Sequence, residues 1–341
     1  MRKYTVMIIY GGEGYERDIS QRSAEFFEKI KTDERLLTIF VYISADGRWY
    51  LSNDGACRDT RVLSPLIVCR GGVVSGGRFF GVDIAIPIMH GDRGEDGYIA
   101  SYLWHNKIRS VGSPYYTASL LRDKVAVKLF AGELSVPTAD FAFFPEGEIP
   151  AREELLKIAE RLGFPLFVKP RRLGSSIGAS RADDIDELCL SVQKASLDFC
   201  GGILIERAVS VLLEAECAYL EGIGGGKYAV GAVMTGGSAY SYERKYLTPE
   251  KTEVRADYPR SGEERDRIIE YSRALVRALG IRSLCRVDFF VCSDGEVLFN
   301  EINHIPGFTE DSLFPRLMFP RGAGLSDWVY GVAQAAASEP W

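Results

Sequence analysis

The sequence predicts a mixed α/β protein of two or three domains. One observation is the length of 341 residues, against about 150 residues for an average domain. Another is the alternation of apolar, β-branched segments with amphipathic ones along the first third of the chain. Such alternation favours a parallel sheet with helices on its faces. The 35 glycines exceed the usual share of about 7% and indicate many tight loops.

The first third contains the clearest alternation of strands and helices. Strands are expected at residues 5–10, 36–43 and 82–89, and a helix at residues 19–31. Gly112-Ser113-Pro114 then interrupts the pattern. Because such residues are typical of turns and linkers, we end an N-terminal α/β domain, residues 1–112, at this point.

The remaining two thirds mix strands and helices without an internal repeat. Helices are expected at residues 116–131, 151–162, 183–195 and 263–279, strands at 138–144, 165–169, 202–209, 214–220 and 227–234, and further helix near the end. We divide this part into a central domain, residues 113–205, and a C-terminal domain, residues 206–341. Residues 235–259 are polar and lack a clear period, which is typical of a functional loop.

Composition and charge exclude several classes of function. The 41 basic and 47 acidic residues give a formal net charge of -6 without a run of like charge. We therefore expect neither a nucleic acid nor an anionic membrane as the main partner. No apolar stretch approaches the roughly 18 residues of a membrane span, and the apolar N-terminal part is too short for a signal peptide. The seven cysteines form no Cys-x-x-Cys, so we expect a cytoplasmic protein without disulfides or zinc.

The most informative segment is residues 284–303. Two strands with alternating side chains flank Asp294-Gly295, which is typical of a two-residue hairpin turn. In the register that this turn imposes, four polar side chains share one face and lie opposite one another in pairs. The pairs are Asp288 with Glu301, and Arg286 with Asn303.

The facing carboxylates of this hairpin predict a metal site. Two carboxylates opposite each other repel, and a hard divalent cation removes that cost. Magnesium prefers Asp, Glu and Asn oxygens and commonly keeps phosphate oxygens among its ligands, so a nucleoside triphosphate is expected nearby. Alternatively, Arg286 neutralises Asp288 on a solvated polar face.

A second segment has the composition of a phosphate-binding loop. Lys169 ends an apolar strand, and the Gly/Ser-rich residues 174–178 follow. Backbone N–H groups and hydroxyls of such a loop can bind phosphate, and the lysine adds a positive charge. The alternative is a lysine at a strand end beside an ordinary loop. The chain has no P-loop motif, so this loop is not a P-loop. Arg17 stands where a dinucleotide fingerprint requires its third glycine, which excludes a nicotinamide-dependent dehydrogenase.

Short motifs in a fixed order span nearly the whole chain. They are Gly11-Gly12 with Glu16-Arg17 and Ser20, His90-Gly91 with Gly94-Glu95-Asp96-Gly97, Asp123-Lys124, Lys169 with Gly174-Ser175-Ser176 and Gly178, Lys245-Tyr246, Arg286-Val287-Asp288, Asn300-Glu301-Ile302-Asn303, Pro306-Gly307, Thr309 and Ser312-Leu313. Together they resemble the ATP-grasp ligases, and specifically the D-alanine–D-alanine ligase family. The resemblance implies a three-domain ATP-grasp architecture, in which an N-terminal parallel-sheet domain binds substrate and two α+β domains clamp ATP.

The resemblance also implies a reaction. Two D-alanines would be joined to D-alanyl-D-alanine, a peptidoglycan precursor, through a D-alanyl phosphate, with release of ADP and phosphate. ATP would be the co-substrate, together with two Mg²⁺ (or Mn²⁺) ions. Similar enzymes are commonly cytoplasmic homodimers.

Individual residues receive roles from the same resemblance. ATP would be bound by Lys124, Lys169, Ser176, Glu206, Arg207, Val209, Glu214, Lys245, Asn300 and Glu301. The metal ligands would be Asp288, Glu301 and Asn303. D-Alanine would be bound by Glu16, His90, Ser175, Arg286, Gly307, Ser312 and Leu313. The catalytic residues would be Glu16, Ser175, Tyr246, Arg286 and Gly307.

Two positions bear on the second substrate. Family members that use D-lactate tend to carry histidine at the position of Tyr246, and those that use D-lactate or D-serine carry arginine at that of Leu313. The resemblance therefore favours D-alanine. A ligase for D-lactate, D-serine or another amino acid and a nucleotide-binding protein without ligase activity are the alternatives.

Four features depart from the family pattern. Arg207 replaces a lysine, Tyr98 a small or polar residue, and His304 a threonine. Residues 209–214 lack the usual glycine and are one residue longer, which leaves the placement of Glu214 open. His304 follows a metal ligand and is either a neutral packing residue or a group that perturbs the site near neutral pH.

Overall fold

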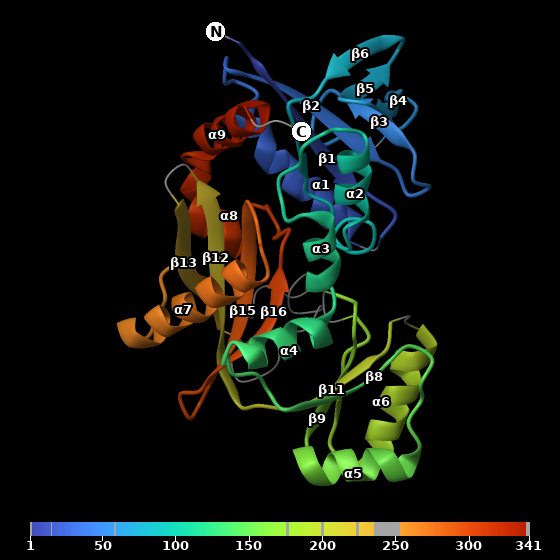
Figure 1. The fold of residues 1–341 in the computed structure, drawn as a ribbon, viewed down its shortest axis with the longest axis vertical. Coiled ribbons are helices and arrows are strands. Elements are labelled where there is room, and N and C mark those ends of the chain that lie inside the picture. Colours follow the sequence, from blue (N-terminus) through green and yellow to red (C-terminus); the bar gives the residue numbers. More distant parts are fainter. Residues whose placement is uncertain are drawn as a thin grey trace.

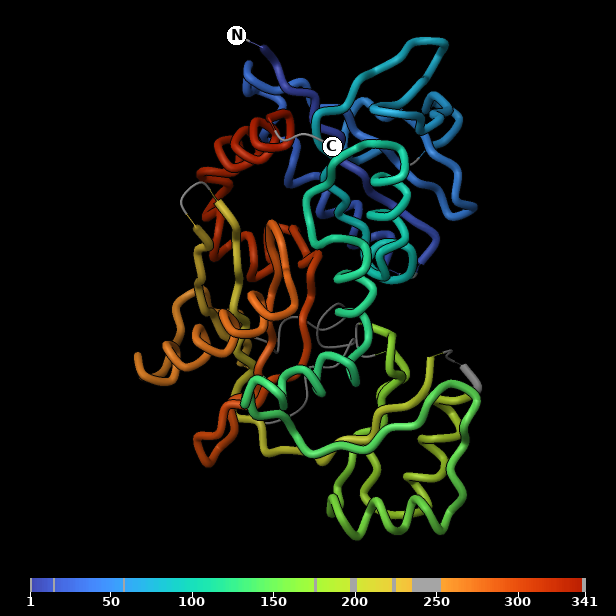
Figure 2. The backbone as a smooth tube through the Cα atoms, viewed as in Figure 1, coloured from blue at the N-terminus to red at the C-terminus, as the bar shows by residue number. Residues whose placement is uncertain are grey.

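The computed structural model describes residues 2–14, 16–57, 59–174, 177–198, 201–222, 225–234 and 253–338. Within these ranges the chain forms three β-sheets with helices packed against them, so the mixed α/β class is confirmed (Figure 1). The C-terminal helix returns to the N-terminal sheet, as the tube in Figure 2 shows. No helix in these ranges combines the length and the apolar character that crossing a membrane requires.

The N-terminal sheet has seven strands in the order β6-β5-β4-β3-β2-β1-β7. They are β1 Tyr4–Gly11, β2 Leu36–Ile43, β3 Trp49–Ser52, β4 Ser64–Cys69, β5 Gly72–Ser75, β6 Arg78–Gly81 and β7 Ile84–Pro87. β1 pairs in parallel with β2 and β7, which confirms the expected parallel core. Strands β3 to β6 extend the sheet by antiparallel pairing and were not predicted.

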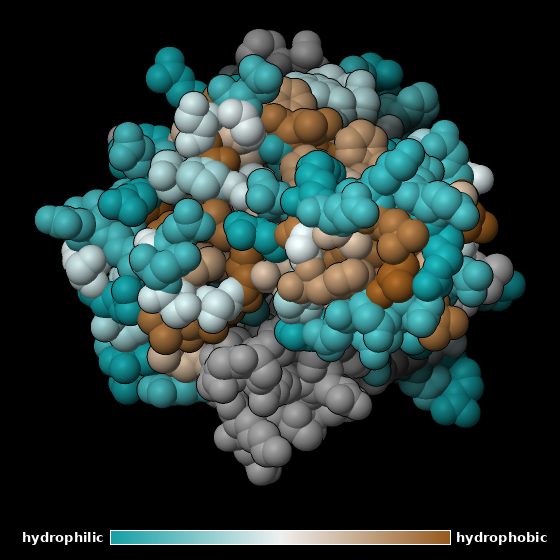
Figure 3. All heavy atoms as spheres, turned by 90° about the horizontal axis from the view of Figure 1, so that it is seen from below, coloured by the Kyte–Doolittle hydropathy of each residue, from teal (hydrophilic) through white to brown (hydrophobic). Residues whose placement is uncertain are grey.

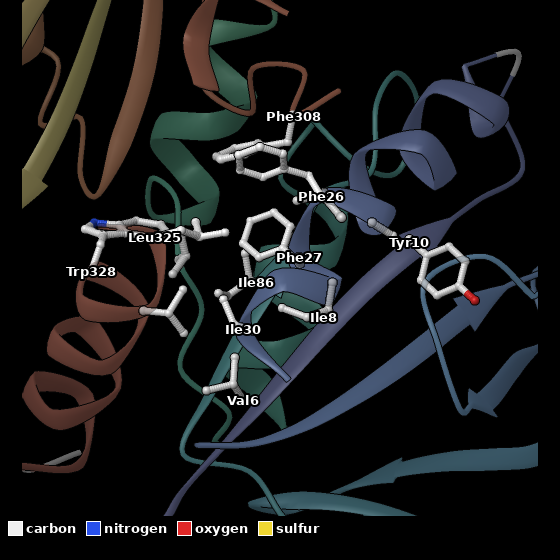
Figure 4. Packing of buried hydrophobic residues seen from close by; sticks show 14 of the residues in the cluster. Val6, Ile8, Tyr10, Phe26, Phe27, Ile30, Ile86, Phe308, Leu325 and Trp328 are labelled. Atoms are coloured by element: carbon white, nitrogen blue, oxygen red, sulfur yellow. The ribbon is translucent and has the colours of Figure 1, made fainter. Parts of the chain in front are cut away.

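Strand β1 is buried on both faces because helices cover the sheet from both sides. Side chains of one face, including Val6 and Ile8, pack with Phe27 and with Trp328 of the C-terminal helix (Figure 4). The opposite face packs against the helix that contains Leu103. Each large apolar side chain buried here contributes about 1.5–3 kcal/mol. The elements are α1 Arg17–Phe26, η1 Phe27–Ile30, α2 Tyr98–His105 and α9 Leu325–Ser338.

The second sheet is small and antiparallel, in the order β10-β9-β11-β8. Its elements are β8 Phe141–Phe144, α5 Arg152–Leu162, β9 Leu166–Pro170, β10 Ser180–Ala182, α6 Ile185–Asp198 and β11 Ile203–Arg207. Seen from the end where α5 and α6 lie, the surface is largely hydrophilic, with apolar side chains gathered in patches near its middle (Figure 3). The predicted boundary between residues 205 and 206 falls within β11, and the division into three domains stays a prediction.

The third sheet is antiparallel, in the order β14-β13-β12-β15-β16. Its strands are β12 Val211–Gly222, β13 Gly225–Met234, β14 Glu253–Arg255, β15 Leu284–Cys292 and β16 Val297–Asn303. α4 (Lys124–Glu133) packs on β16, whereas α7 (Gly262–Ala278) and α8 (Leu313–Met318) pack on β12 and β13. A short 3₁₀ turn, η4 Pro320–Gly322, leads into α9.

The helix predicted at residues 116–131 is two helices. α3 spans Tyr115–Leu121, and α4 spans Lys124–Glu133. Asp123 begins the second helix because its side chain accepts a hydrogen bond from the Ala126 N–H over 3.2 Å. The polar segment predicted to be a functional loop lies mostly outside the described residues, and its described end forms β14.

Candidate active site

A cavity of about 970 Å³ is lined by strand residues of the second and third sheets, by α1 and by the loops that follow β1 and β7. The described residues that the sequence predicted for the site all line this cavity. They are Glu16, His90, Lys124, Lys169, Glu206, Arg207, Val209, Glu214, Arg286, Asp288, Asn300, Glu301, Asn303, Gly307, Ser312 and Leu313. Ser175, Ser176, Lys245 and Tyr246 lie outside the described residues.

The hairpin of β15 and β16 forms one end of the cavity. Asp288 pairs with Glu301, and Arg286 with Asn303, so the predicted pairing is confirmed. The Arg286 guanidinium donates to both Asp288 carboxylate oxygens, over 2.7 and 2.6 Å, and Asn303 Nδ2 donates to Asp288 Oδ2 over 2.8 Å. Arg286 and Asp288 are each only 8% exposed. The ion pair of the alternative interpretation exists, but the solvated face does not.

The hairpin reaches the predicted pairing through two deviations that cancel. Its turn contains residues 293–295, so the prediction of a two-residue turn is wrong. Between Asp288 and Phe289 the pairing shifts by one residue, which leaves Asn300 as a bulge in β16. The bulge compensates for the longer turn, so the pairs nearest the cavity keep their register.

Glu216 is a buried carboxylate in the site that the sequence analysis missed. It lies opposite Asp288 in the sheet, and its Oε2 is 3.2 Å from Arg286 Nε. Burial raises the pKa of Asp288 to about 7; Arg286 opposes this rise, whereas Glu216 and Glu301 add to it. Because side chains two apart on a strand share a face, the spacing from Glu214 could have identified Glu216.

Two lysines form the wall next to the hairpin. Lys124 opens α4, and its Nζ lies 3.4 Å from Glu301 Oε2. Lys169 lies near the end of β9, with its Nζ 2.5 Å from Glu206 Oε2. Burial opposes ionisation of Glu206, yet Lys128 and Lys169 hold its pKa at about 2. This wall presents the two cationic groups that a polyphosphate requires.

Another part of the cavity wall lies along β11 and β12. Arg207 ends β11 and is half-exposed, with its Nε 3.7 Å from Asp140 Oδ2. The pairing of β12 with β15 shifts at Leu212, whose side chain is 39% exposed. With this bulge in β12, Glu214 lies on the cavity wall.

The opposite end is built from loops at the carboxyl ends of the parallel strands, where α/β sheets commonly bind ligands. Glu16 follows β1 and precedes α1, and His90 follows β7. A Cβ atom on Gly91, whose φ is +73°, would lie 3.0 Å from Glu16 Oε2. Glycine at this position therefore allows the two loops to approach.

Glu95 contacts both His90 and Arg122 at this end of the cavity, and it was not predicted as a site residue. Its Oε1 lies 3.6 Å from His90 Nδ1, and its Oε2 accepts a hydrogen bond from Arg122 over 3.0 Å. Burial alone would raise the pKa of Glu95, but the hydrogen bond with His90 and the Arg122 charge lower it to about 2. The carboxylate is thus ionised and fixed between two partners.

The segment before α8 completes the lining. Ser312 Oγ lies 2.7 Å from Thr309 Oγ1, and a Cβ atom on Gly307 would lie 3.0 Å from Ser312 Oγ. Leu313 begins α8 and is 3% exposed. It packs on the backbone of β13, because a Cβ atom on Gly231 would lie 2.8 Å from Leu313 Cδ1.

Comparisons with known proteins decide the family of this chain. The family model described as D-ala D-ala ligase C-terminus matches residues 130–332. The chain is 32% identical to the D-alanine–D-alanine ligase of Treponema pallidum, over 94% of this chain and 85% of that protein. The chain belongs to the D-alanine–D-alanine ligase family.

Another D-alanine–D-alanine ligase and two solved structures match this chain over nearly its whole length. The enzyme of Lactococcus lactis is 30% identical, over 96% of this chain and 95% of that protein. The VanG D-Ala:D-Ser ligase from Enterococcus faecalis superposes with a TM-score of 0.84 at 25% identity, covering 97% of this chain and 100% of that chain. D-alanyl-alanine synthetase A from Vibrio cholerae has a TM-score of 0.86 at 23% identity, covering 99% and 100%. The expected ATP-grasp architecture is confirmed.

His304, which departs from the pattern of the D-alanine–D-alanine ligase family, is buried. Its side chain is 4% exposed, and its Nε2 lies 2.7 Å from the Glu95 carbonyl oxygen. Burial lowers the pKa of His304. The imidazole is therefore neutral at neutral pH and donates through Nε2, which agrees with a packing residue. Tyr98, another departure, is 54% exposed at the start of α2.

The hairpin of this D-alanine–D-alanine ligase family member has donors that fit a divalent cation. In the described ranges no three His, Cys, Asp or Glu side chains form a group that could hold a metal ion. Asp288 and Glu301 nevertheless face each other, and Asn303 adds an amide. Burial raises the pKa of Asp288, the charges of Glu216 and Glu301 add to this rise, and a bound cation would oppose it. Such a donor set fits an ion that completes its shell with phosphate oxygens.

Proposed function

We propose that this chain joins two D-alanine molecules to D-alanyl-D-alanine for peptidoglycan synthesis, with conversion of ATP to ADP and phosphate. The observation that carries the proposal is that one cavity combines a lysine wall, a carboxylate hairpin and a Glu16–His90 end. The relative in Treponema pallidum is named for this activity, which supports the assignment. A D-alanyl phosphate is the intermediate that connects the two steps.

The nucleotide lies along β9, β11 and β12 in this proposal. Lys124 and Lys169 bind its phosphates, and the adenosine is framed by Glu206, Arg207, Val209 and Glu214. Ser176, Lys245, Asn300 and Glu301 complete the ATP-binding residues. Two divalent ions, Mg²⁺ or Mn²⁺, held by Asp288, Glu301 and Asn303, would supply positive charge that offsets the charge developing in phosphoryl transfer.

The first D-alanine lies between the Glu16 end and the hairpin. Glu16 pairs with its ammonium group, and a carboxylate oxygen attacks the γ-phosphorus and displaces ADP. The amine of the second D-alanine then attacks the acyl carbon, and phosphate leaves with that carboxylate oxygen. Arg286 and the Gly307 N–H stabilise the oxyanion of the tetrahedral intermediate.

The remaining residues position substrates and exclude water. His90 lies beside the first D-alanine, Ser175 and Tyr246 orient it together with Glu16, and Ser312 binds the carboxylate of the second. Lys245 would bind the γ-phosphate. Exclusion of water from an acyl phosphate prevents its hydrolysis.

D-Alanine is the proposed second substrate. Leu313 packs as an apolar residue on β13 and presents no charge to the cavity. The similarity to a D-Ala:D-Ser ligase at 25% identity gives D-serine as the alternative.

The proposal is tested by ADP release from the purified protein with Mg²⁺ and ATP. D-Alanine is supplied alone, with D-serine or with D-lactate, and L-alanine serves as the control. We expect release with D-alanine alone and a product with the mass of D-alanyl-D-alanine. Release only with a mixed pair would change the second substrate, and no release with any pair would overturn the proposed ligase activity.

We also propose that the protein acts as a homodimer in the cytoplasm. All six described cysteines are free, which suits a reducing compartment. Aromatic side chains are exposed on α2, including Trp104 at 53%, which suits contact with a second copy through the N-terminal sheet. Sedimentation of the purified protein at twice the monomer mass of 37.9 kDa is expected; a monomer at all concentrations would contradict the dimer.

A further inference from the structure

Lys128 is a buried cation that the proposed mechanism does not use. It lies one turn after Lys124 on α4, and its side chain is 1% exposed. Its Nζ is 3.5 Å from the Phe299 carbonyl oxygen, where α4 packs on β16. Lys128 is not part of the cavity wall as the structure describes it, whereas Lys124 is. An ammonium group buried this deeply requires a compensating charge.

The compensating charge is Glu206, which Lys128 shares with Lys169. Lys128 Nζ lies 2.6 Å from Glu206 Oε1, and Lys169 Nζ lies 2.5 Å from Glu206 Oε2. Burial lowers the pKa of Lys128, and the Glu206 charge offsets part of that shift. The cluster therefore holds two ammonium groups on one carboxylate, with a net charge of about +1.

The two lysines differ in what they can reach. The side chain of Lys169 is 18% exposed and lines the cavity, so it can turn toward a phosphate group. If Lys169 were the only partner of Glu206, binding a phosphate would separate it from a buried carboxylate and leave that carboxylate uncompensated. Lys128 remains on Oε1 whatever Lys169 does, because it is enclosed by the protein.

We infer that Lys128 is a positioning residue for the nucleotide: it keeps Glu206 paired and in place so that Lys169 can exchange this carboxylate for the triphosphate. The inference rests on the proposed function in one respect, namely that ATP is the nucleotide bound in this cavity. Without Lys128, turning Lys169 toward a phosphate would leave Glu206 buried and unpaired, so ATP binding would carry that cost.

The test measures the dissociation constant of ATP with Mg²⁺ by calorimetry, without D-alanine. The variants are K128M, which keeps the chain length but removes the charge, K128R, E206Q and the double variant K128M/E206Q. Lys194→Met, at an exposed position of α6, is the matched control. We expect K128M to weaken ATP binding about tenfold, since an interaction with a charged group is removed, and K128R to weaken it less.

The double variant separates a positioning role from a structural one. With Glu206 absent, Lys169 is free in either case, so K128M/E206Q is expected to bind ATP within about twofold of E206Q. The double variant has neither buried charge, so this comparison remains available if K128M does not fold. Unchanged ATP affinity in K128M, or the same tenfold loss in both backgrounds, would overturn the inference.

The Michaelis constants provide a second readout. K128M should raise the KM for ATP and leave that for D-alanine within about twofold, because the cluster lies away from the Glu16 end. An equal rise in both constants would contradict the positioning role. Since the calorimetric test needs no D-alanine, a failure to form dipeptide would overturn the proposed function and leave the inference about Lys128 standing.

Discussion

The two ends of the cavity each hold a carboxylate with a shifted pKa, and the two pKa values are shifted in opposite directions. At the hairpin, burial raises the pKa of Asp288 to about 7 despite the Arg286 charge, because Glu216 and Glu301 add negative charge. At the loop end, burial is overcome by His90 and Arg122, and the pKa of Glu95 falls to about 2.

The difference lies in the balance of charge around each group. Arg286 serves two carboxylates in direct contact and lies near Glu301, so Asp288 shares its cationic partner with a second carboxylate. At the loop end Glu95 lies beside both His90 and Arg122, and these groups favour its ionised form. The hairpin end is thus built to receive cations, and the loop end to hold its geometry without them.

Removal of Arg286 is expected to have the largest effect. R286M leaves Glu216 and Asp288 without their shared partner and removes the cation proposed to stabilise the oxyanion. We expect kcat for dipeptide formation to fall about 10³-fold, with R277M, at an exposed position of α7, as the control. A kcat within about tenfold of the parent would show that Arg286 does not contact the reacting atoms.

The second-largest effect is expected from neutralising the hairpin carboxylates, which should change the Mg²⁺ dependence of ADP release. In D288N and E301Q the excess negative charge is reduced, so we expect the Mg²⁺ concentration for half-maximal ADP release to rise about tenfold or turnover to be lost. The control is D294N, in the exposed turn of the same hairpin. If both variants retain the Mg²⁺ dependence of the parent, these residues are not the metal ligands.

The lowered pKa of Glu95, at the loop end, predicts that the stability of the protein depends on pH. The folded-state pKa of this carboxylate, about 2, lies below the ordinary 4.5. The ionised carboxylate therefore contributes fully to the free energy of unfolding above pH 4.5, and this contribution is lost as the pH falls through 2. E95Q should lower the free energy of unfolding at pH 7 by about 2 kcal/mol. Urea unfolding at pH 7 and pH 3, with E148Q as an exposed control, measures this loss, and the deficit should shrink at pH 3. A deficit independent of pH would contradict an electrostatic origin.

The smallest effect is expected at Leu313, which concerns only the second substrate. L313R places a guanidinium in a buried site on β13, and we expect the KM for the second D-alanine to rise about fivefold while that for the first stays unchanged. L313M, which nearly conserves volume, is the control. No change in the second KM would remove Leu313 from the specificity residues.

Much of the hairpin end could be predicted from sequence because its residues are close together in the chain. Residues within one hairpin meet through a periodicity of two, so Asp288 and Glu301 could be paired without knowledge of the fold. Even so, the pairing is correct because the three-residue turn and the bulge at Asn300 cancel. Such insertions leave no local signal, and the bulge at Leu212 likewise required the structure.

The loop end was less predictable because it depends on contacts between distant segments. Glu95 and Arg122 meet across 27 positions in the chain, and no local period relates them. Strands β3 to β6 were missed because they are only four to six residues long and lack sustained alternation. The return of α9 to the N-terminal sheet is also a tertiary contact that no local pattern contains.

Activation of the first D-alanine as an acyl phosphate is tested most directly by following the oxygen atoms of its carboxylate. With D-alanine labelled with ¹⁸O in its carboxyl group, Mg²⁺ and ATP, the carboxylate attacks the γ-phosphorus, and one labelled oxygen leaves with phosphate. We expect one ¹⁸O in each phosphate released with D-alanyl-D-alanine, measured by mass spectrometry. Dipeptide formed with unlabelled phosphate would show that the carboxylate is not activated at the γ-phosphorus, and would contradict the account.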